Sequence, residues 1–124
     1  MKFIKPQKGS IFYEDDKVYA CLASHPIAKG HSVVVWKSPV KDLHLLSRKD
    51  YEHLMNVVDI TRGALLKTLK LRKVYLVYAD EVEQVHWHLV PRFDEKGFNI
   101  LTHKPSLLKD VSLAEKIKTN LPTK

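Results

Sequence analysis

Residues 84–92, with the sequence QVHWHLVPR, constrain the fold more than any other segment of this chain. Apolar and polar side chains alternate there with a period of two, which is typical of a β-strand with one face in a core. Residues two apart on a strand project to the same side. The pattern predicts a strand over residues 84–90, ended by Pro91, with His86 and His88 together on one face. The alternate side chains are expected in the core: Val85, Trp87 and Leu89.

Four further β-prone runs precede this strand. Residues 11–13 and 18–23 flank a short polar turn and predict a hairpin. Residues 32–36 are rich in valine and follow a loop that contains Pro and Gly, and residues 74–78 form another β-branched and aromatic run. With residues 84–90 as the fifth and central strand, these runs predict a sheet of about five strands.

One long and one short helix are also predicted. Apolar residues recur at helical spacing from Ser47 to about Leu69, and Ser47 is a good N-cap residue. Gly63 weakens this helix locally, where a kink or a close approach to the sheet would fit. Residues 94–97 are expected to form a turn, and residues 112–115 fit a capping box that opens a short C-terminal helix. The chain is therefore assigned to the α+β class.

Composition limits the class of protein. A length of 124 residues and a hydrophobic content of 44% fit a single domain over residues 1–124. No apolar run approaches the roughly 20 residues that cross a bilayer, and residues 1–6 do not resemble a signal peptide, so a cytoplasmic protein without a membrane partner is expected. Cys21, the single cysteine, excludes an internal disulfide and is expected to be buried. The formal charge of +7 attracts phosphate, but no nucleic-acid-binding motif accompanies the lysines.

A His-x-His pair is weak evidence by itself. Seven histidines in 124 residues give an expected number of such pairs of roughly one third by chance. The pair gains weight from its β-branched and aromatic strand, from Pro91 and Arg92 after it, and from Gly30 and His31 upstream. This combination, rather than the spacing alone, indicates a functional site.

Residues 84–92 resemble the signature of the histidine-triad (HIT) family, in which three histidines alternate with other residues along a strand. Residues 13–20 are similar to the family's N-terminal hairpin, and residues 26–35 resemble its Pro-x-x-x-Gly-His-x-x-Val segment. The resemblance covers roughly residues 10–95 and leaves residues 96–124 as a C-terminal extension. It implies a HIT-like α+β fold, with an antiparallel sheet of about five strands, one long helix and a short C-terminal helix.

The resemblance also implies a function. In the family, the middle histidine attacks the α-phosphorus of a nucleoside phosphate derivative, and water hydrolyses the nucleotidyl-histidine. That nucleophile corresponds to His86, the third triad position to His88, and a supporting histidine to His31. Substrate contacts are implied for three further residues: Gln84, Gly30 and Arg92. The expected activity is that of a nucleotide hydrolase or nucleotidyl transferase acting on dinucleoside polyphosphates or nucleoside phosphoramidates, without a cofactor, in a homodimer.

Several positions depart from the family pattern. Gln84 replaces the first triad histidine, so the triad is degenerate. Ala23 stands where family members place an acidic or amide residue for the ribose hydroxyls, and Pro39 stands near the place of a further histidine. Residues 80–83, which include three carboxylates, replace a glycine-rich loop and would repel a phosphate unless they face away or hold a cation.

Three other classes of function stay open from the sequence, of which nucleic-acid binding through the basic residues ranks last. His86 and His88 could bind a divalent metal such as Zn²⁺, with His31 or Glu83 as a third ligand, in a metal-dependent hydrolase. The departures from the family pattern are also compatible with a nucleotide-binding or interaction module that has no catalytic activity. The remaining histidines are interpreted as ordinary surface or helix residues: His25, His44, His53 and His103.

Overall fold

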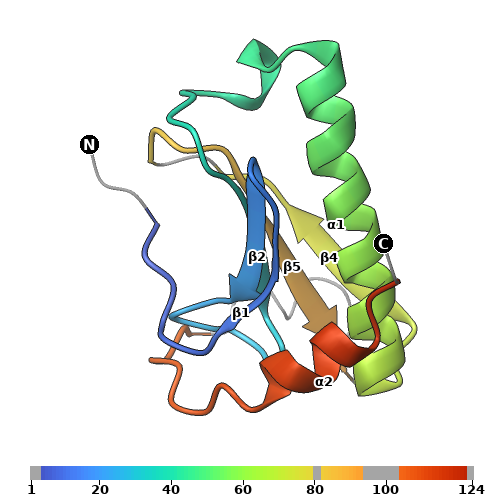
Figure 1. Ribbon diagram of the computed structural model, residues 1–124. Coiled ribbons are helices and arrows are strands. Elements are labelled where there is room, and N and C mark those ends of the chain that lie inside the picture. The colour runs from blue at the N-terminus through green and yellow to red at the C-terminus, as the bar shows by residue number, and fades with distance from the viewer. Residues whose placement is uncertain (1–3, 80–81, 94–103, 123–124) are drawn as a thin grey trace.

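The computed structural model describes residues 4–79, 82–93 and 104–122 (Figure 1). Within these ranges the chain forms a five-stranded sheet of order β1-β2-β3-β5-β4, in which every neighbouring pair is antiparallel. This architecture confirms the predicted α+β class with a long helix and a short C-terminal helix. The elements in chain order are β1 (Ile11–Glu14), β2 (Val18–Leu22), β3 (Ser32–Trp36), a 3-10 helix (Leu43–Leu45), α1 (Arg48–Leu69), β4 (Lys73–Val77), β5 (His86–Arg92) and α2 (Leu113–Thr119).

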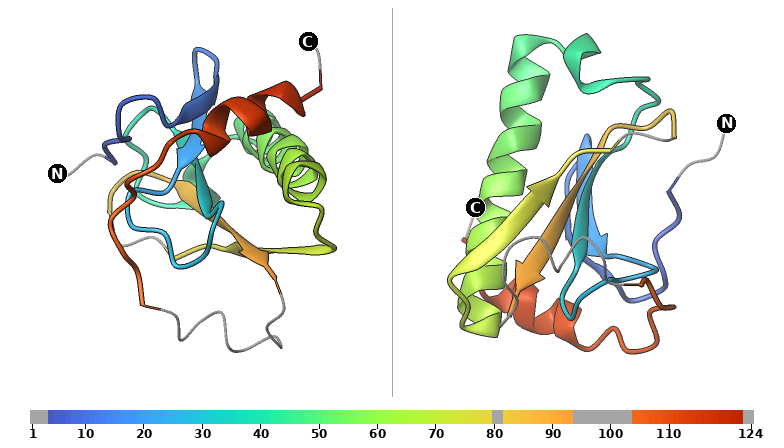
Figure 2. Two further views of the ribbon diagram at one scale, coloured as in Figure 1. Left: turned by 90° about the horizontal axis from the view of Figure 1, so that it is seen from below. Right: turned by 180° about the vertical axis from the view of Figure 1, so that it is seen from behind.

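The long helix α1 covers one face of the sheet (Figures 1 and 2). Its N-cap is Ser47, as predicted, and the Ser47 hydroxyl accepts a hydrogen bond from the backbone N–H of Asp50 at 3.1 Å. The helix ends before Lys70, which adopts a left-handed backbone with a φ of 56°. The buried side chains of α1 recur at helical spacing: Leu54, Val57, Val58, Thr61, Ala64 and Leu65.

The side chains that face α1 form the main core. Ala20 pairs with Val34 and Val34 pairs with Trp87, so these three side chains form a row across β2, β3 and β5. Val85 and Leu89 are fully buried in the same cluster, and Trp87 packs against it. The prediction that Val85, Trp87 and Leu89 point into the core is therefore confirmed.

The opposite face of the sheet carries the histidine pair. His86 pairs with Val35 and His88 pairs with Val33, so the two histidines share one face with these valines, as predicted. The N-terminal segment crosses this face, where Ile4 packs against a small apolar cluster (Figure 2). The buried members of that cluster are Tyr19, Cys21, Ala23, Val33 and Val35. The two faces thus differ in what covers them.

The predicted bounds and position of β5 need correction. The strand begins at His86, not at Gln84, and runs through Pro91 to Arg92. Pairing with β3 stops at Leu89, so beyond this residue only β4 flanks β5, and a proline without an N–H is accommodated there. β5 lies between β3 and β4, which leaves the central place in the sheet to β3.

Two predicted details of the helices are wrong. Gly63 is exposed within an unbroken α1, and an added Cβ would meet nothing within 4 Å, so neither an interruption nor a close contact with the sheet occurs there. Ser112 has a helical backbone and no side-chain capping bond; instead the Asp110 carboxylate accepts a hydrogen bond from the Ser112 N–H at 2.9 Å. The turn predicted over residues 94–97 lies outside the described residues. In the described parts of the chain, no helix combines the length and apolar character of a membrane span.

Candidate functional site

The backbone before β5 orients the ring of His86. Its Nδ1 lies 2.8 Å from the carbonyl oxygen of Gln84. A carbonyl only accepts hydrogen bonds, so the proton of the neutral ring is on Nδ1 and the lone pair is on Nε2. His86 is 7% exposed, and its ring centroid lies 5.0 Å from that of His88. Gln84 therefore supplies, through its backbone, the acceptor that a nucleophilic imidazole requires.

A second chain of hydrogen bonds fixes the other two rings. The backbone N–H of Ile27 donates to His31 Nδ1 at 3.1 Å, which places the proton of the neutral His31 ring on Nε2. His31 Nε2 lies 2.9 Å from His88 Nδ1 and therefore donates to it. The proton of His88 must then be on Nε2. His86 and His88 consequently present opposite groups, a lone pair and an N–H donor, from side-by-side positions.

Burial keeps His31 and His88 uncharged. It is the main cause that lowers the pKa of each ring from 6.5 to about 4, and the neighbouring histidine lowers it further in both cases. Both rings are therefore neutral at neutral pH, as the hydrogen-bond chain requires. No carboxylate is among the causes that act on these two pKa values.

The loop that carries His31 is held from two sides. Gly30 has a φ of +83°, a backbone conformation that favours glycine, and a Cβ there would lie 2.7 Å from Leu69 Cδ1, so the Leu69 side chain would have to move. On the other side, the C-terminal segment donates from Ser106 N to Pro26 O at 3.1 Å and from Leu108 N to Ser24 O at 2.7 Å. These contacts fix the loop backbone, including the N–H that sets the His31 tautomer.

A pocket of about 370 Å³ opens beside the three histidines. Its floor is apolar, because it is lined by Cys21 of β2, by Ala23 just after β2 and by Val33 of β3. The N-terminal segment contributes one wall. The lining residues are Ile4, Lys5, Cys21, Ala23, Ser24, His25, His31, Val33, His86 and His88.

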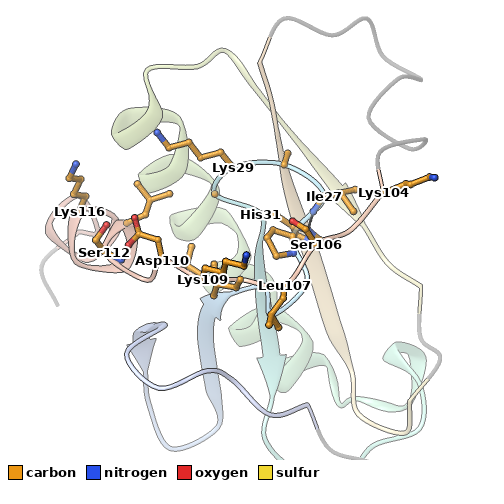
Figure 3. Close-up of a pocket in the computed structure, with 16 residues that line it drawn as sticks. Ile27, Lys29, His31, Lys104, Ser106, Leu107, Lys109, Asp110, Ser112 and Lys116 are labelled. Carbon is orange, nitrogen blue, oxygen red and sulfur yellow. Dashed lines mark hydrogen bonds between the residues drawn. The ribbon is translucent and has the colours of Figure 1, made fainter.

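A second pocket, of about 500 Å³, is bounded by the His31 loop and the C-terminal segment (Figure 3). His31 lines both pockets, and several lysines surround this one. The smaller pocket is the candidate functional site because it alone, of the two, is lined by His86 and His88.

The structure separates the sequence-predicted site residues into two groups. His31, His86 and His88 meet at the 370 Å³ pocket. Gly30 shapes the turn before His31 and lines only the larger of the two pockets. Arg92 lies on the same strand face four residues after His88, which is ~13 Å along β5, and it does not line the site pocket.

The side chain of Gln84 points into the protein rather than into the pocket. It is 3% exposed, and its amide is hydrogen bonded to backbone groups of Ile4, Trp36 and Lys37. The substrate contact implied for Gln84 therefore reduces, in this structure, to the carbonyl that holds His86.

The metal alternative finds no ligand set in the described residues. No group of three His, Cys, Asp or Glu side chains there could hold a metal ion. His31 has both ring nitrogens in hydrogen bonds, and Glu83 is exposed and does not line the pocket. Among the residues that the structure describes, the pair formed by His86 and His88 thus lacks the third ligand that a protein zinc site requires.

Parts of the site were not predicted from the sequence. His25, interpreted there as an ordinary histidine, lines the pocket together with Ser24. Ile4 and Lys5, near the N-terminus, form a wall although they are about 80 positions along the chain from His86 and His88. Ile27 acts on the site through its backbone N–H, which donates to His31 Nδ1. Only the nearby Pro26 and Gly30 marked this loop in the sequence, and nothing there marked the N-terminal wall.

Known proteins resemble this chain in sequence and in fold. A HIT-like protein from Mesomycoplasma hyorhinis is 32% identical over 102 residues, 75% of this chain and 90% of its own length. Among solved structures, a Hit-like protein involved in cell-cycle regulation from Bartonella henselae has a TM-score of 0.76 at 22% identity, over 90% of this chain and 86% of its own. The diadenosine triphosphate hydrolase of Plasmodium falciparum has a TM-score of 0.73 at 16% identity, over 91% and 76%. The sequence model of the HIT domain matches residues 5–95, so the chain belongs to the HIT domain family.

Proposed function

We propose that this protein is a nucleotide hydrolase or nucleotidyl transferase that acts on the α-phosphate of nucleoside phosphate derivatives through a covalent nucleotidyl-His86. The observation that carries the proposal is the pair of opposite tautomers. His86 offers a lone pair on Nε2, and His88 beside it offers an N–H on Nε2. A phosphoryl group needs both, an electron pair for phosphorus and a donor for its oxygens.

The reaction has two displacement steps. The Nε2 lone pair of His86 attacks the α-phosphorus, an N–P bond forms, and the bond from phosphorus to the leaving group breaks with its electron pair on the leaving group. The proton stays on Nδ1 of His86 and is hydrogen bonded to the Gln84 carbonyl, which stabilises the positive charge that develops on the ring. Water then attacks phosphorus, its proton passes to solvent, and the N–P electron pair returns to Nε2. A second acceptor in place of water would give transfer.

His88 acts in this scheme as a neutral donor to the phosphoryl oxygens. Its pKa of about 4 leaves little of the charged form at neutral pH, and its Nδ1 is occupied by His31. A neutral imidazole N–H stabilises negative charge on oxygen but is a poor proton source for an amine. The site therefore favours leaving groups that depart as stable anions, as a phosphate chain does. We place dinucleoside polyphosphates ahead of nucleoside phosphoramidates as substrates, and the structural neighbour from Plasmodium falciparum is a hydrolase of the first class.

The test is to look for the covalent intermediate. Wild type and His86→Ala are incubated with diadenosine polyphosphate, quenched in milliseconds to seconds, and digested for mass spectrometry under conditions that preserve phosphoramidate bonds. We expect an adenylyl group on the peptide that contains His86 and turnover that His86→Ala reduces by at least about a thousandfold. His53→Ala is the matched control, because His53 is a partly exposed histidine that pairs with Asp15 away from the pocket.

Three results would contradict the proposal. An adduct on another residue would move the nucleophile elsewhere. Nucleotide binding by wild type without turnover or adduct, and unchanged by His86→Ala, would favour a nucleotide-binding or interaction module. Stoichiometric metal in the purified protein, lost in His88→Ala together with activity, would favour a metal-dependent hydrolase instead.

A two-fold homodimer belongs to the same proposal. β4 is an edge strand, and Leu76 on it is 40% exposed on the side of the sheet that α1 covers. An exposed edge beside a helix is a surface on which two copies can pair. Sedimentation at micromolar concentration should show twice the mass of 14.3 kDa, and Leu76→Asp should shift the protein toward monomer. A cytoplasmic location stays a prediction from the sequence.

A further inference from the structure

The side chain of Gln84 joins three segments of the chain beneath the site. Its Oε1 accepts a hydrogen bond from the Ile4 N–H at 2.8 Å. Its Nε2 donates to the carbonyls of Trp36 and Lys37 at 3.2 and 3.4 Å. The amide is buried, at 3% exposure, and lies 80 positions along the chain from Ile4. One residue therefore connects the N-terminal segment, the end of β3 and the entry to β5.

A glutamine amide suits this junction and an imidazole does not. The amide has two N–H donors and one oxygen acceptor, which match the two carbonyls and the one N–H around it. A neutral histidine has one donor and one acceptor, so it would leave one of these carbonyls without this donor. Unmet hydrogen-bonding groups in a buried place cost stability. Gln84 is thus a fitted residue at this position.

The same residue holds both the nucleophile and a wall of the pocket. The Gln84 carbonyl binds His86 Nδ1, and the Gln84 amide binds Ile4, which lines the pocket. The Ile4 carbonyl accepts from the Tyr19 hydroxyl at 3.0 Å, so both backbone groups of Ile4 are fixed. Near Gln84 the backbone is also held by the hydrogen bond from Trp36 N to Val85 O at 2.9 Å and by the pairing of His86 with Val35 in the sheet. The amide adds the restraint of the Gln84 side chain to the carbonyl that orients His86.

We infer that Gln84 is a positioning residue, whose side-chain amide couples the N-terminal wall of the pocket to the orientation of the His86 ring. The inference rests on the proposed function of His86 for its effect on turnover. The coupling itself is a property of the fold and can be measured without turnover. In this inference Gln84, at the degenerate triad position, orients His86 through both its backbone carbonyl and its side-chain amide.

Two variants break the same contact from opposite ends. Gln84→Met keeps the length of the side chain and removes all its hydrogen bonds. Ile4→Pro removes the N–H that binds Gln84 Oε1, and it also shortens the apolar side chain and fixes φ at residue 4. The matched control is Gln7→Met, because Gln7 lies in the same N-terminal segment and donates to Leu108 O at 3.0 Å, away from Gln84.

The main readout is the protonation of the His86 ring nitrogens, from ¹⁵N shifts in long-range ¹H–¹⁵N NMR spectra. We expect wild type to show a protonated Nδ1 and an unprotonated Nε2, and Gln84→Met to show averaged tautomers with kcat about tenfold lower. Ile4→Pro should shift the same signals less and mainly raise KM. The kcat and the His86 signals of the double variant should match those of Gln84→Met, since both changes remove one shared contact. Gln7→Met should leave the His86 signals and kcat unchanged.

Each failure has a distinct signature. Unchanged His86 signals in both folded variants would overturn the inference, and so would an equal shift in Gln7→Met or additive effects in the double variant. If Gln84→Met does not fold, Ile4→Pro decides, and no change in its His86 signals overturns the inference. If the variants show shifted His86 signals but the wild type forms no adduct, the coupling stands and the proposed function does not.

Discussion

The two faces of the sheet differ in what covers them. On one face a helix of 22 residues packs against a large core, and α1 residues such as Leu54 and Leu65 are completely buried. On the other face the buried apolar cluster is small, and the covering segment includes Ile4, which is only partly buried. Two buried histidines, His31 and His86, lie on this second side.

This contrast shows how one sheet can provide both stability and a site. Alternation along β5 sends Leu89 to the helix and His88 to the other side, with no change in the backbone. A helix fills its face with apolar side chains, whereas the N-terminal segment leaves a pocket of about 370 Å³. Partial cover also keeps the histidine rings dry enough to lower the pKa of His31 and His88. The variants below test whether the helix face provides stability and the histidine face provides the site.

Truncation on the helix face should affect stability far more than the site. Leu54 is fully buried in the main core, so Leu54→Ala should lower the free energy of unfolding by about 2–5 kcal/mol, from lost burial and the cavity left behind. Urea unfolding monitored by circular dichroism measures the change. Leu45→Ala is the matched control, because Leu45 is 57% exposed and its loss should cost less than about 0.5 kcal/mol. A shift of the His86 ring signals in folded Leu54→Ala would show that the faces are not independent.

Mild acid should weaken the protein through the histidine face. Between pH 6.5 and about 4 the unfolded chain binds a proton at His31 that the folded protein does not, so the free energy of unfolding falls as pH falls. The full shift corresponds to about 3 kcal/mol for this group, and His88 adds in the same direction. Hydrogen bonds outweigh burial at Asp15 and lower its pKa from 3.8 to about 2, so the contribution of Asp15 is lost only at lower pH.

His31→Gln is the variant that isolates this titration. Urea unfolding of wild type and His31→Gln, measured at intervals from pH 7 to 4, should give a steeper loss of stability in wild type. Equal slopes for the two proteins would show that His31 is not held neutral by burial.

Two glycines should respond in opposite directions. Gly30 has a φ of +83°, which strains a residue that has a Cβ, and the Leu69 side chain would have to move, so Gly30→Ala should lower the free energy of unfolding by about 1–2 kcal/mol. Gly63 lies in the exposed interior of α1 with nothing within 4 Å, so Gly63→Ala should raise it by about 0.5–1 kcal/mol. Melting temperatures of the two variants, compared with wild type, measure both signs. Stabilisation by Gly30→Ala would contradict the fixed turn before His31.

Much of the fold was predictable because local signals agreed with it. The period of two placed His86 and His88 on one face, and the Ser47 cap with its helical apolar spacing gave α1 its correct N-terminus. The errors arose where distant neighbours decide the outcome. Pro91 does not end β5, because β3 has already ended beside it, and Asp110 rather than Ser112 accepts the capping hydrogen bond at α2.

Residues close together along the chain are enough to predict the alternation of β5, the glycine before His31 and the family. The tautomers depend on contacts that form only in the folded protein. They follow from an Ile27 N–H in a loop, a Gln84 carbonyl before the strand and a contact between His31 and His88. The contacts of Gln84, which occupies the position of the first triad histidine, also depend on the tertiary structure. The hydrogen-bond partners of Gln84 include Ile4, 80 positions away, and such partners meet only when the chain folds.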